Sequence, residues 1–222
     1  MEASKGFLFT ECVEIKELLG TRAKDELELM DRIEEIPADS IYYHTHSYFL
    51  RHSYIVESYP NDFANWVSIQ IRDPDLGERL GAITPWGHKT LEDLREEFLE
   101  IIDEHLASTN IIGFAPYAKP FFFMKSRIIK VPTDICSETL TQFRDALKVI
   151  DASGLYNHIF EARLRLERGK SDFSIWLREV ICENDLANEI ETIDWYMYSL
   201  EEIRRKLIDL CNKKLIIRKR AR

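Results

Sequence analysis

Apolar positions along the chain follow one order of patterns twice. Each time, an apolar and β-branched stretch opens the pattern and predicts a short strand, first at Phe7–Ile15 and then at Phe121–Val131. Apolar residues at helical spacing follow, at Leu27, Met30, Ile33 and Ile36 and then at Leu140, Phe143, Leu147 and Ile150. Each half therefore begins with a strand that leads into a helix.

More helices are predicted after these openings. A Tyr-x-His helix comes next, and then a helix with the pattern Asp-Phe-x-x-Trp. A short helix around Leu76–Ile83 or Leu186–Ile193 precedes a final helix that starts at Thr90 or Ser199, where Ser199-x-x-Glu202 is a capping box and Thr90-x-x-Asp93 a weaker one. The predicted fold class is α-rich α+β.

The two series of elements align residue by residue, which indicates a tandem duplication. An offset of 114 pairs Ile36–His44 with Ile150–His158, an offset of 110 pairs Asp62 with Asp172, and an offset of 109 pairs Trp86 with Trp195. We expect a first repeat at residues 1–112 and a second at 113–222, joined by the apolar connector 111–120 and packed as one globule. The opening strands are expected to pair.

Charge narrows the classes of partner. The net charge is −9, although the last eleven residues hold six basic side chains and no acidic one, so the rest of the chain is more acidic still. Because an acidic body repels phosphate backbones, we do not expect a nucleic-acid partner. The basic C-terminal tail is expected to be solvated and mobile. With no apolar stretch of membrane-spanning length and no signal peptide, we expect a cytoplasmic protein without a membrane partner.

Sequence motifs for cofactors and catalysis are missing. The chain has no G-x-G-x-x-G, P-loop, G-x-S-x-G or H-E-x-x-H pattern, so we predict no cofactor and name no catalytic residue. Its four cysteines lie far apart without a C-x-x-C pair, and we expect them to be reduced and mostly buried.

One set of polar residues occurs in both halves and forms the candidate ligand-binding site. If His44 and Arg51 lie on one helix, seven residues apart, they share a face, and Asp62 begins the next helix. The corresponding residues of the second half are His158, Arg165 and Asp172. Such a set can hold a phosphate or carboxylate through the arginine and a titratable histidine. The alternative is a half-buried network that fixes helix packing. The presence of these residues in both halves favours this alternative.

The other histidines and the tryptophans are interpreted separately. His46 is a further candidate because Phe160 replaces it in the second half, but His44 and His46 on a helix point about 200° apart and cannot share a metal ion. We predict no metal site and interpret His52, His88 and His105 as surface or loop residues. Trp66 and Trp176 are expected in the core. Differences between the halves, such as His46 and the Thr84–His88 loop, are better functional candidates.

Several motifs resemble those of a prokaryotic protein family of unknown function. They include Ser40–His46 (SIYYHTH), Asn61–Trp66 (NDFANW) and Ser171–Trp176 (SDFSIW), and the resemblance covers nearly the whole chain. It implies a relative but no reaction, cofactor or catalytic residue.

Two functions remain open. The first is a non-enzymatic binding or interaction module with a groove between its repeats for an unknown protein or small-molecule partner. The alternative is an enzyme acting on an anionic or sugar-like substrate, with His44 or His158 as acid or base and Arg51 or Arg165 as anion clamp. An open pocket around these residues would favour the enzyme, and complete enclosure would disfavour it.

Overall fold

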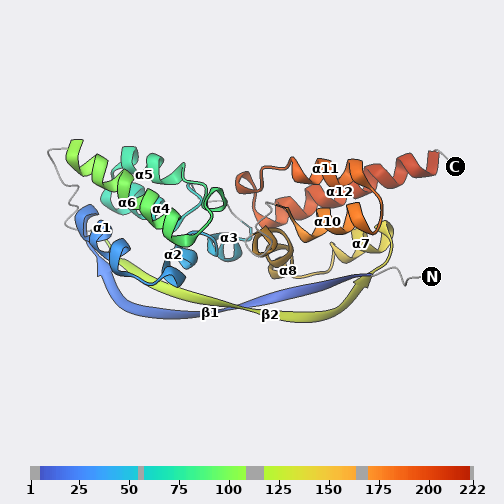
Figure 1. The fold of residues 1–222 in the computed structure, drawn as a ribbon, viewed down its shortest axis with the longest axis horizontal. Helices are drawn as coiled ribbons and strands as arrows, with labels where there is room; N and C mark the ends of the chain where they lie inside the picture. Colours follow the sequence, from blue (N-terminus) through green and yellow to red (C-terminus); the bar gives the residue numbers. More distant parts are fainter. Residues whose placement is uncertain (1–5, 55–57, 109–117, 164–169, 221–222) are drawn as a thin grey trace. The chain divides into compact units, whose positions relative to one another are not determined.

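The computed structural model describes residues 6–54, 58–108, 118–163 and 170–220, which form an α-rich α+β fold. Two long strands, β1 (Phe7–Ala23) and β2 (Phe121–Ser137), pair as a two-stranded ribbon and run in opposite directions (Figure 1). The predicted strands are confirmed at both places and pair as expected. Each has 17 residues and is longer than predicted.

The ribbon takes part in two compact units. Unit 1 contains residues 1–13, 52–55 and 129–222, and unit 2 contains residues 14–51 and 56–128. The start of each strand therefore belongs to the unit that is formed by the helices of the other half. The predicted boundary between repeats, at 112/113, and most of the connector 111–120 fall outside the described residues.

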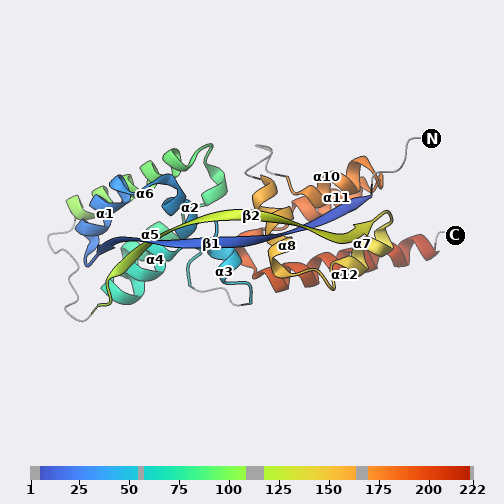
Figure 2. The same cartoon turned by 90° about the horizontal axis from the view of Figure 1, so that it is seen from below.

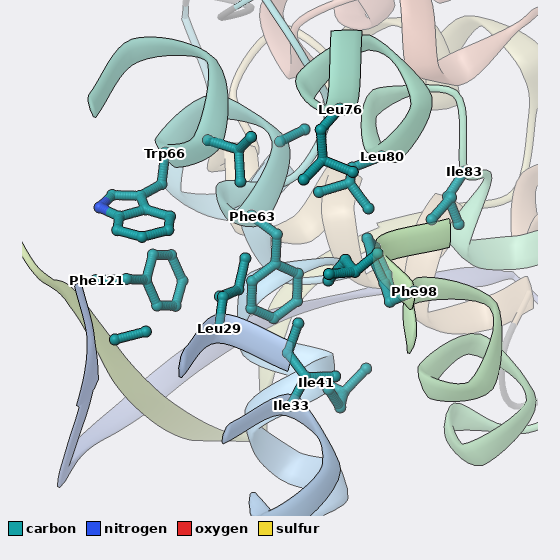
Figure 3. Packing of buried hydrophobic residues seen from close by; sticks show 14 of the residues in the cluster. Leu29, Ile33, Ile41, Phe63, Trp66, Leu76, Leu80, Ile83, Phe98 and Phe121 are labelled. Atoms are coloured by element: carbon teal, nitrogen blue, oxygen red, sulfur yellow. The ribbon is translucent and has the colours of Figure 1, made fainter. Parts of the chain in front are cut away.

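The helices of unit 2 come from the first half of the chain. They are α1 (Glu26–Glu35), α2 (Ala38–His44), α3 (Tyr48–Arg51), α4 (Asp62–Trp66), a π-helical turn (Val67–Ile71), α5 (Pro74–Gly81), a 3₁₀ turn (Pro85–Gly87) and α6 (Leu91–Ser108). Phe121 and Phe123 of β2 pack among them, with the Phe63 and Phe121 ring centroids 5.3 Å apart (Figure 3). The strand thus completes the apolar core of this unit.

Unit 1 has the same kinds of element. Its helices are α7 (Leu140–Ala146), α8 (Ala152–Tyr156), a π-helical turn (Asn157–Glu161), α10 (Asp172–Glu179), α11 (Asn184–Glu191), a 3₁₀ turn (Trp195–Met197) and α12 (Leu200–Arg220). Phe7 and Phe9 of β1 fill its core, and Phe7 lies 5.6 Å from Trp176 between ring centroids. In each unit the described helices all lie on one face of its part of the ribbon (Figures 1 and 2).

Most local expectations are confirmed. Both capping boxes form, with the Ser199 amide donating to Glu202 at 2.9 Å and the Thr90 amide donating to Asp93 at 3.1 Å. Trp66 and Trp176 are both buried, as predicted. Among the described residues, no helix combines the length and apolarity that crossing a membrane requires.

Three expectations are wrong. The basic tail is not a mobile segment, because α12 continues to Arg220, and Lys214 and Arg218 pair with the carboxylate of Glu183. His105 is not a surface residue: it is 4% exposed in the last turn of α6. Cysteines are buried in only two cases, at Cys12 and Cys211, while Cys136 and Cys182 are exposed.

Candidate functional site

His44 and Arg51 do not lie on one helix, contrary to prediction. Helix α2 ends at His44, a turn follows, and α3 covers Tyr48–Arg51. The turn is closed by the Thr45 hydroxyl, which donates to the carbonyl of Ile41 at 2.6 Å. Because of this turn, the side chains of His44 and Arg51 contact the same carboxylate.

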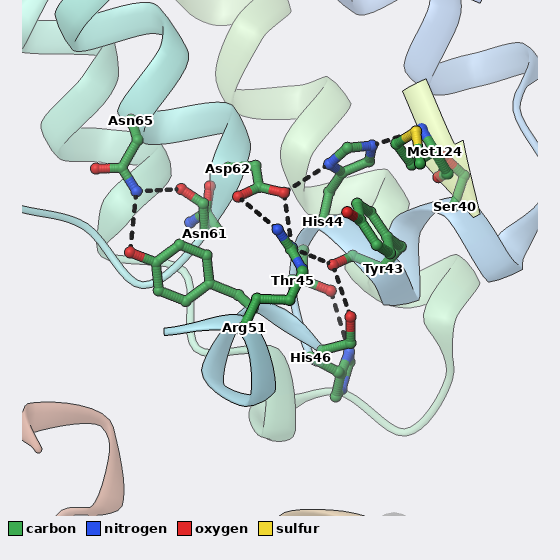
Figure 4. A network of polar contacts seen from close by, with 12 residues as sticks. Ser40, Tyr43, His44, Thr45, His46, Arg51, Asn61, Asp62, Asn65 and Met124 are labelled. Atoms are coloured by element: carbon green, nitrogen blue, oxygen red, sulfur yellow. Dashed lines mark hydrogen bonds and ion pairs between the residues drawn. The ribbon is translucent and has the colours of Figure 1, made fainter. Parts of the chain in front are cut away.

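That carboxylate belongs to Asp62, the first residue of α4 (Figure 4). Its Oδ2 lies 2.8 Å from His44 Nδ1 and 2.8 Å from Arg51 Nη2, and its Oδ1 lies 3.4 Å from Arg51 Nη1. A carboxylate at a helix start is also favoured by the unpaired amides and dipole of that helix. The first predicted set, His44, Arg51 and Asp62, is therefore brought together.

The second nitrogen of His44 reaches the ribbon. His44 Nε2 accepts the backbone N–H of Met124 in β2 at 3.0 Å, and Ser40, one turn earlier in α2, donates its hydroxyl to the Met124 carbonyl at 2.6 Å. Since Nε2 is the acceptor, the proton of the neutral ring is on Nδ1 and is donated to Asp62. Both backbone groups of Met124 are thus occupied by side chains of α2, at a strand edge that would otherwise be unpaired.

Burial and the neighbouring charges together determine the protonation of His44 and Asp62. His44 is 3% exposed, and burial lowers the pKa of its imidazole, an effect that the hydrogen bond to Asp62 opposes. Burial alone would raise the pKa of Asp62, but the hydrogen bond from His44 and the charge of Arg51 lower it overall. The set is therefore a neutral imidazole between a strand amide and an ionised carboxylate, with Arg51 balancing the charge.

Arg51 is also held by groups of the protein. Its Nη2 donates to the Tyr43 carbonyl at 2.7 Å, and its guanidinium carbon lies 4.0 Å from the centre of the Tyr43 ring. The buried Nε has no hydrogen-bond partner within the described part of the chain. The two terminal nitrogens, which would grip an anion as a fork, already bind Asp62 and Tyr43.

The second set repeats the same connections in unit 1. His158 Nδ1 lies 2.9 Å from Asp172 Oδ2 at the start of α10, and His158 Nε2 accepts the backbone N–H of Thr10 in β1 at 2.8 Å. Asn157 donates to the Thr10 carbonyl at 3.1 Å, as Ser40 does to Met124. Arg165 lies outside the described residues, so the structure places two of the three predicted members of this set.

His46 belongs to a different environment. It is 1% exposed, stacks on Tyr42 with ring centroids 5.5 Å apart, and meets the Trp86 ring at 4.8 Å. Burial, aided by the nearby His88, lowers its pKa to about 3, and the Pro85 carbonyl opposes the shift. The corresponding Phe160 stacks on Tyr156 at 5.7 Å, so His46 fills an aromatic position of the core.

Sequence reasoning missed the partners on the ribbon. Met124 and Thr10 take part through backbone atoms, which no side-chain motif reveals, and Ser40 and Asn157 differ in type and are not aligned. The one available signal was the spacing of four residues between Ser40 and His44, which places both on one face of a helix.

Fold and site define a class of protein: helical units on a long two-stranded ribbon, each connected to a strand by a buried histidine that also pairs with an aspartate. The chain belongs to a family of unknown function (DUF5752), whose model matches residues 4–212. The solved structure of OrfY from Thermoproteus tenax is similar to it, with a TM-score of 0.74 and 24% identity over 96% of this chain and 97% of that one. This likeness concerns the fold. A comparison with curated proteins found no match.

Proposed function

We propose that the protein is a non-enzymatic interaction module that binds a partner protein through its ribbon. The supporting observation is the exposure of apolar side chains on both strands. In unit 1 these are Leu8, Val13, Ile129 and Val131, which we call the ribbon surface of unit 1; unit 2 exposes Ile15, Leu18 and Phe122. Their exposed fractions run from 39% for Val131 to 56% for Leu18.

Alternation at the strand starts explains why Leu8 and Phe122 point outward, whereas the other exposed apolar residues lie in the later parts of the strands, which are mostly exposed. Phe7 and Phe9 enter the core of unit 1, and Leu8 between them points to the other face, which none of the described helices covers (Figure 1). Strand positions facing water are usually polar. Several exposed apolar residues on neighbouring strands are typical of a surface that binds another protein.

The histidine–aspartate pairs support this proposal by being fully engaged. An acid–base role requires a ring nitrogen that can exchange a proton with a ligand. In His44 and His158 one nitrogen contacts a carboxylate and the other accepts a strand amide, and both rings are buried. We infer a scaffold role for His44, Arg51, Asp62, His158 and Asp172, in preference to an enzyme that uses them on an anionic substrate.

We further propose that the chain arose by tandem duplication. His44 and His158, Asp62 and Asp172, and the amides of Met124 and Thr10 take corresponding roles at the offsets found in the sequence. A duplicated scaffold would retain the contacts that hold helices to strands. This supports the assignment of residues 1–112 and 113–222 as two repeats.

The interaction is tested by photocrosslinking in the cells that produce the protein. Benzoylphenylalanine is introduced at Val13, in the ribbon surface of unit 1, and, as a matched control, at Val149, a valine that is 71% exposed after α7. We expect a discrete crosslinked protein at position 13 and not at 149. The same products from both positions, or none from position 13 in a folded protein, would count against the proposal.

A further inference from the structure

A second group of polar side chains lies in unit 2, apart from Asp62. Glu26 is the first residue of α1, Asp73 is the N-cap of α5, and His105 is in the last turn of α6. One potential ligand atom of each lies within 4.8 Å of the others. Glu26 and His105 are 0% and 4% exposed. Three separate elements thus direct two carboxylates and an imidazole to one buried place.

The geometry orders these groups. His105 Nε2 lies 2.9 Å from Asp73 Oδ2, and His105 Nδ1 lies 3.4 Å from Asp75 Oδ2. The other oxygen of Asp73 accepts the amide of Leu76 at 2.9 Å, which fixes the orientation of the carboxylate. A histidine with one nitrogen toward the centre of a cluster and the other on an outer carboxylate has the arrangement typical of metal ligands.

At the corresponding positions of unit 1, the chain itself supplies a positively charged side chain. Leu140 begins α7, Glu183 is the N-cap of α11, and Lys214 lies on α12. Lys214 Nζ lies 2.8 Å from Glu183 Oε2 and 3.6 Å from Asp185 Oδ2. Unit 1 therefore has a fixed ammonium and a leucine where unit 2 has an imidazole and a glutamate.

This difference changes the charge of the place. In unit 2, the carboxylates of Glu26 and Asp73 and the imidazole of His105 stand at these positions, and the exposed carboxylate of Asp75 lies outside them. Buried carboxylates require a compensating cation. Relative to unit 1, leucine is replaced by glutamate and lysine by histidine, so a fixed ammonium group gives way to two side chains that can act as metal ligands.

We propose that Glu26, Asp73 and His105 bind a divalent first-row transition-metal ion such as Zn²⁺. One imidazole nitrogen and two carboxylate oxygens are a suitable donor set for such ions, whose remaining positions would be taken by water. Asp75 would hold the ring of His105 from outside. The ion would connect the starts of α1 and α5 to the end of α6 and so stabilise unit 2.

The test uses the full chain stripped with a chelator. We expect one Zn²⁺ per chain by elemental analysis after dialysis, and a melting temperature raised by about 5 °C at a hundredfold excess over Kd. The matched control is Glu26→Leu/His105→Lys, which places the leucine and lysine of unit 1 (Leu140 and Lys214) beside Asp73 and should not respond to Zn²⁺. Asp75→Asn should weaken affinity roughly tenfold, as loss of an outer ligand partner does.

A plain ion pair between a protonated His105 and Asp73 gives different results. Wild-type protein would then bind no stoichiometric Zn²⁺, or would be stabilised by it equally in the control variant, and either result overturns the proposal. Should the double variant not fold, His105→Gln replaces it, and Co²⁺ added to the wild type supplies a second readout. Visible absorption of protein-bound Co²⁺ that is lost in His105→Gln supports the site, and its absence in the wild type overturns it.

Discussion

At the scale of single residues, two buried histidines join a strand amide to a carboxylate at a helix start. In each ring, one nitrogen accepts a hydrogen bond from the strand amide and the other donates a hydrogen bond to the carboxylate. No aliphatic side chain can make these two hydrogen bonds. This need accounts for a histidine in both halves and agrees with the scaffold role that we propose for the pairs. His46, by contrast, has an aromatic counterpart in Phe160 and fills space.

The burial of His46 predicts a pH dependence of stability. Unfolded His46 binds a proton below its ordinary pKa of 6.5, whereas folded His46 stays neutral down to about 3. Between these values the unfolded chain binds more protons, so the free energy of unfolding falls as pH falls, by about 2 kcal/mol from pH 7 to 5 for this group.

His46→Phe, which copies Phe160, should remove that part of the dependence. Urea unfolding gives the change in the free energy of unfolding between pH 7 and pH 5 for wild type and for the variant. Subtracting one change from the other leaves the contribution of His46, because the other titrating groups are the same in both proteins. An equal loss of stability in both proteins would show that His46 is not buried and neutral in the folded state.

The sequence alone could predict several residues of the candidate site but not all of their partners. Spacing and the aligned halves brought His44, Arg51 and Asp62 together correctly, although through a turn rather than along one helix. The partners at Met124 and Thr10 escaped because backbone groups leave no pattern. His105 was misjudged because its neighbours Glu26 and Asp73 come from distant elements, and their proximity exists only in the folded chain.

At the scale of elements, the structure consists of predicted helices held to unexpectedly long strands. Apolar periodicity located the helices because their buried faces repeat every three or four residues. It placed only the apolar starts of β1 and β2, since their later parts are exposed and lack alternation. The tail of α12 was misjudged because the pairing of Lys214 and Arg218 with Glu183 is a long-range contact.

The link between α2, α4 and β2 through His44 can be measured by a double-mutant cycle. His44→Ala leaves the Met124 amide without its acceptor and the Asp62 carboxylate with Arg51 alone, and it should lower the free energy of unfolding by about 3 kcal/mol. Asp62→Ala should be similarly costly. The double variant should lose less than the sum, with a coupling energy of about 1–3 kcal/mol from chemical denaturation. If the two single losses of stability simply add in the double variant, His44 and Asp62 are not coupled and the proposed link is contradicted.

At the scale of the whole molecule, each compact unit is built from both halves of the chain. Residues 7–13 of β1 complete the core of unit 1, and residues 121–128 of β2 complete that of unit 2. The inward residues of the strands therefore pack in the two cores. In our account, their outward residues bind a partner protein. In our proposal, the histidine–aspartate pairs stabilise this arrangement and the exposed apolar residues of the ribbon bind the partner.

The most direct test of this account is the affinity for the partner captured at Val13. The dissociation constant is measured by calorimetry for wild type, for Val13→Lys/Ile129→Lys and for the control Val149→Lys. The account predicts binding at least about tenfold weaker in the ribbon variant, with a melting temperature near that of wild type, and unchanged binding in the control. An unchanged dissociation constant in the folded ribbon variant would contradict it.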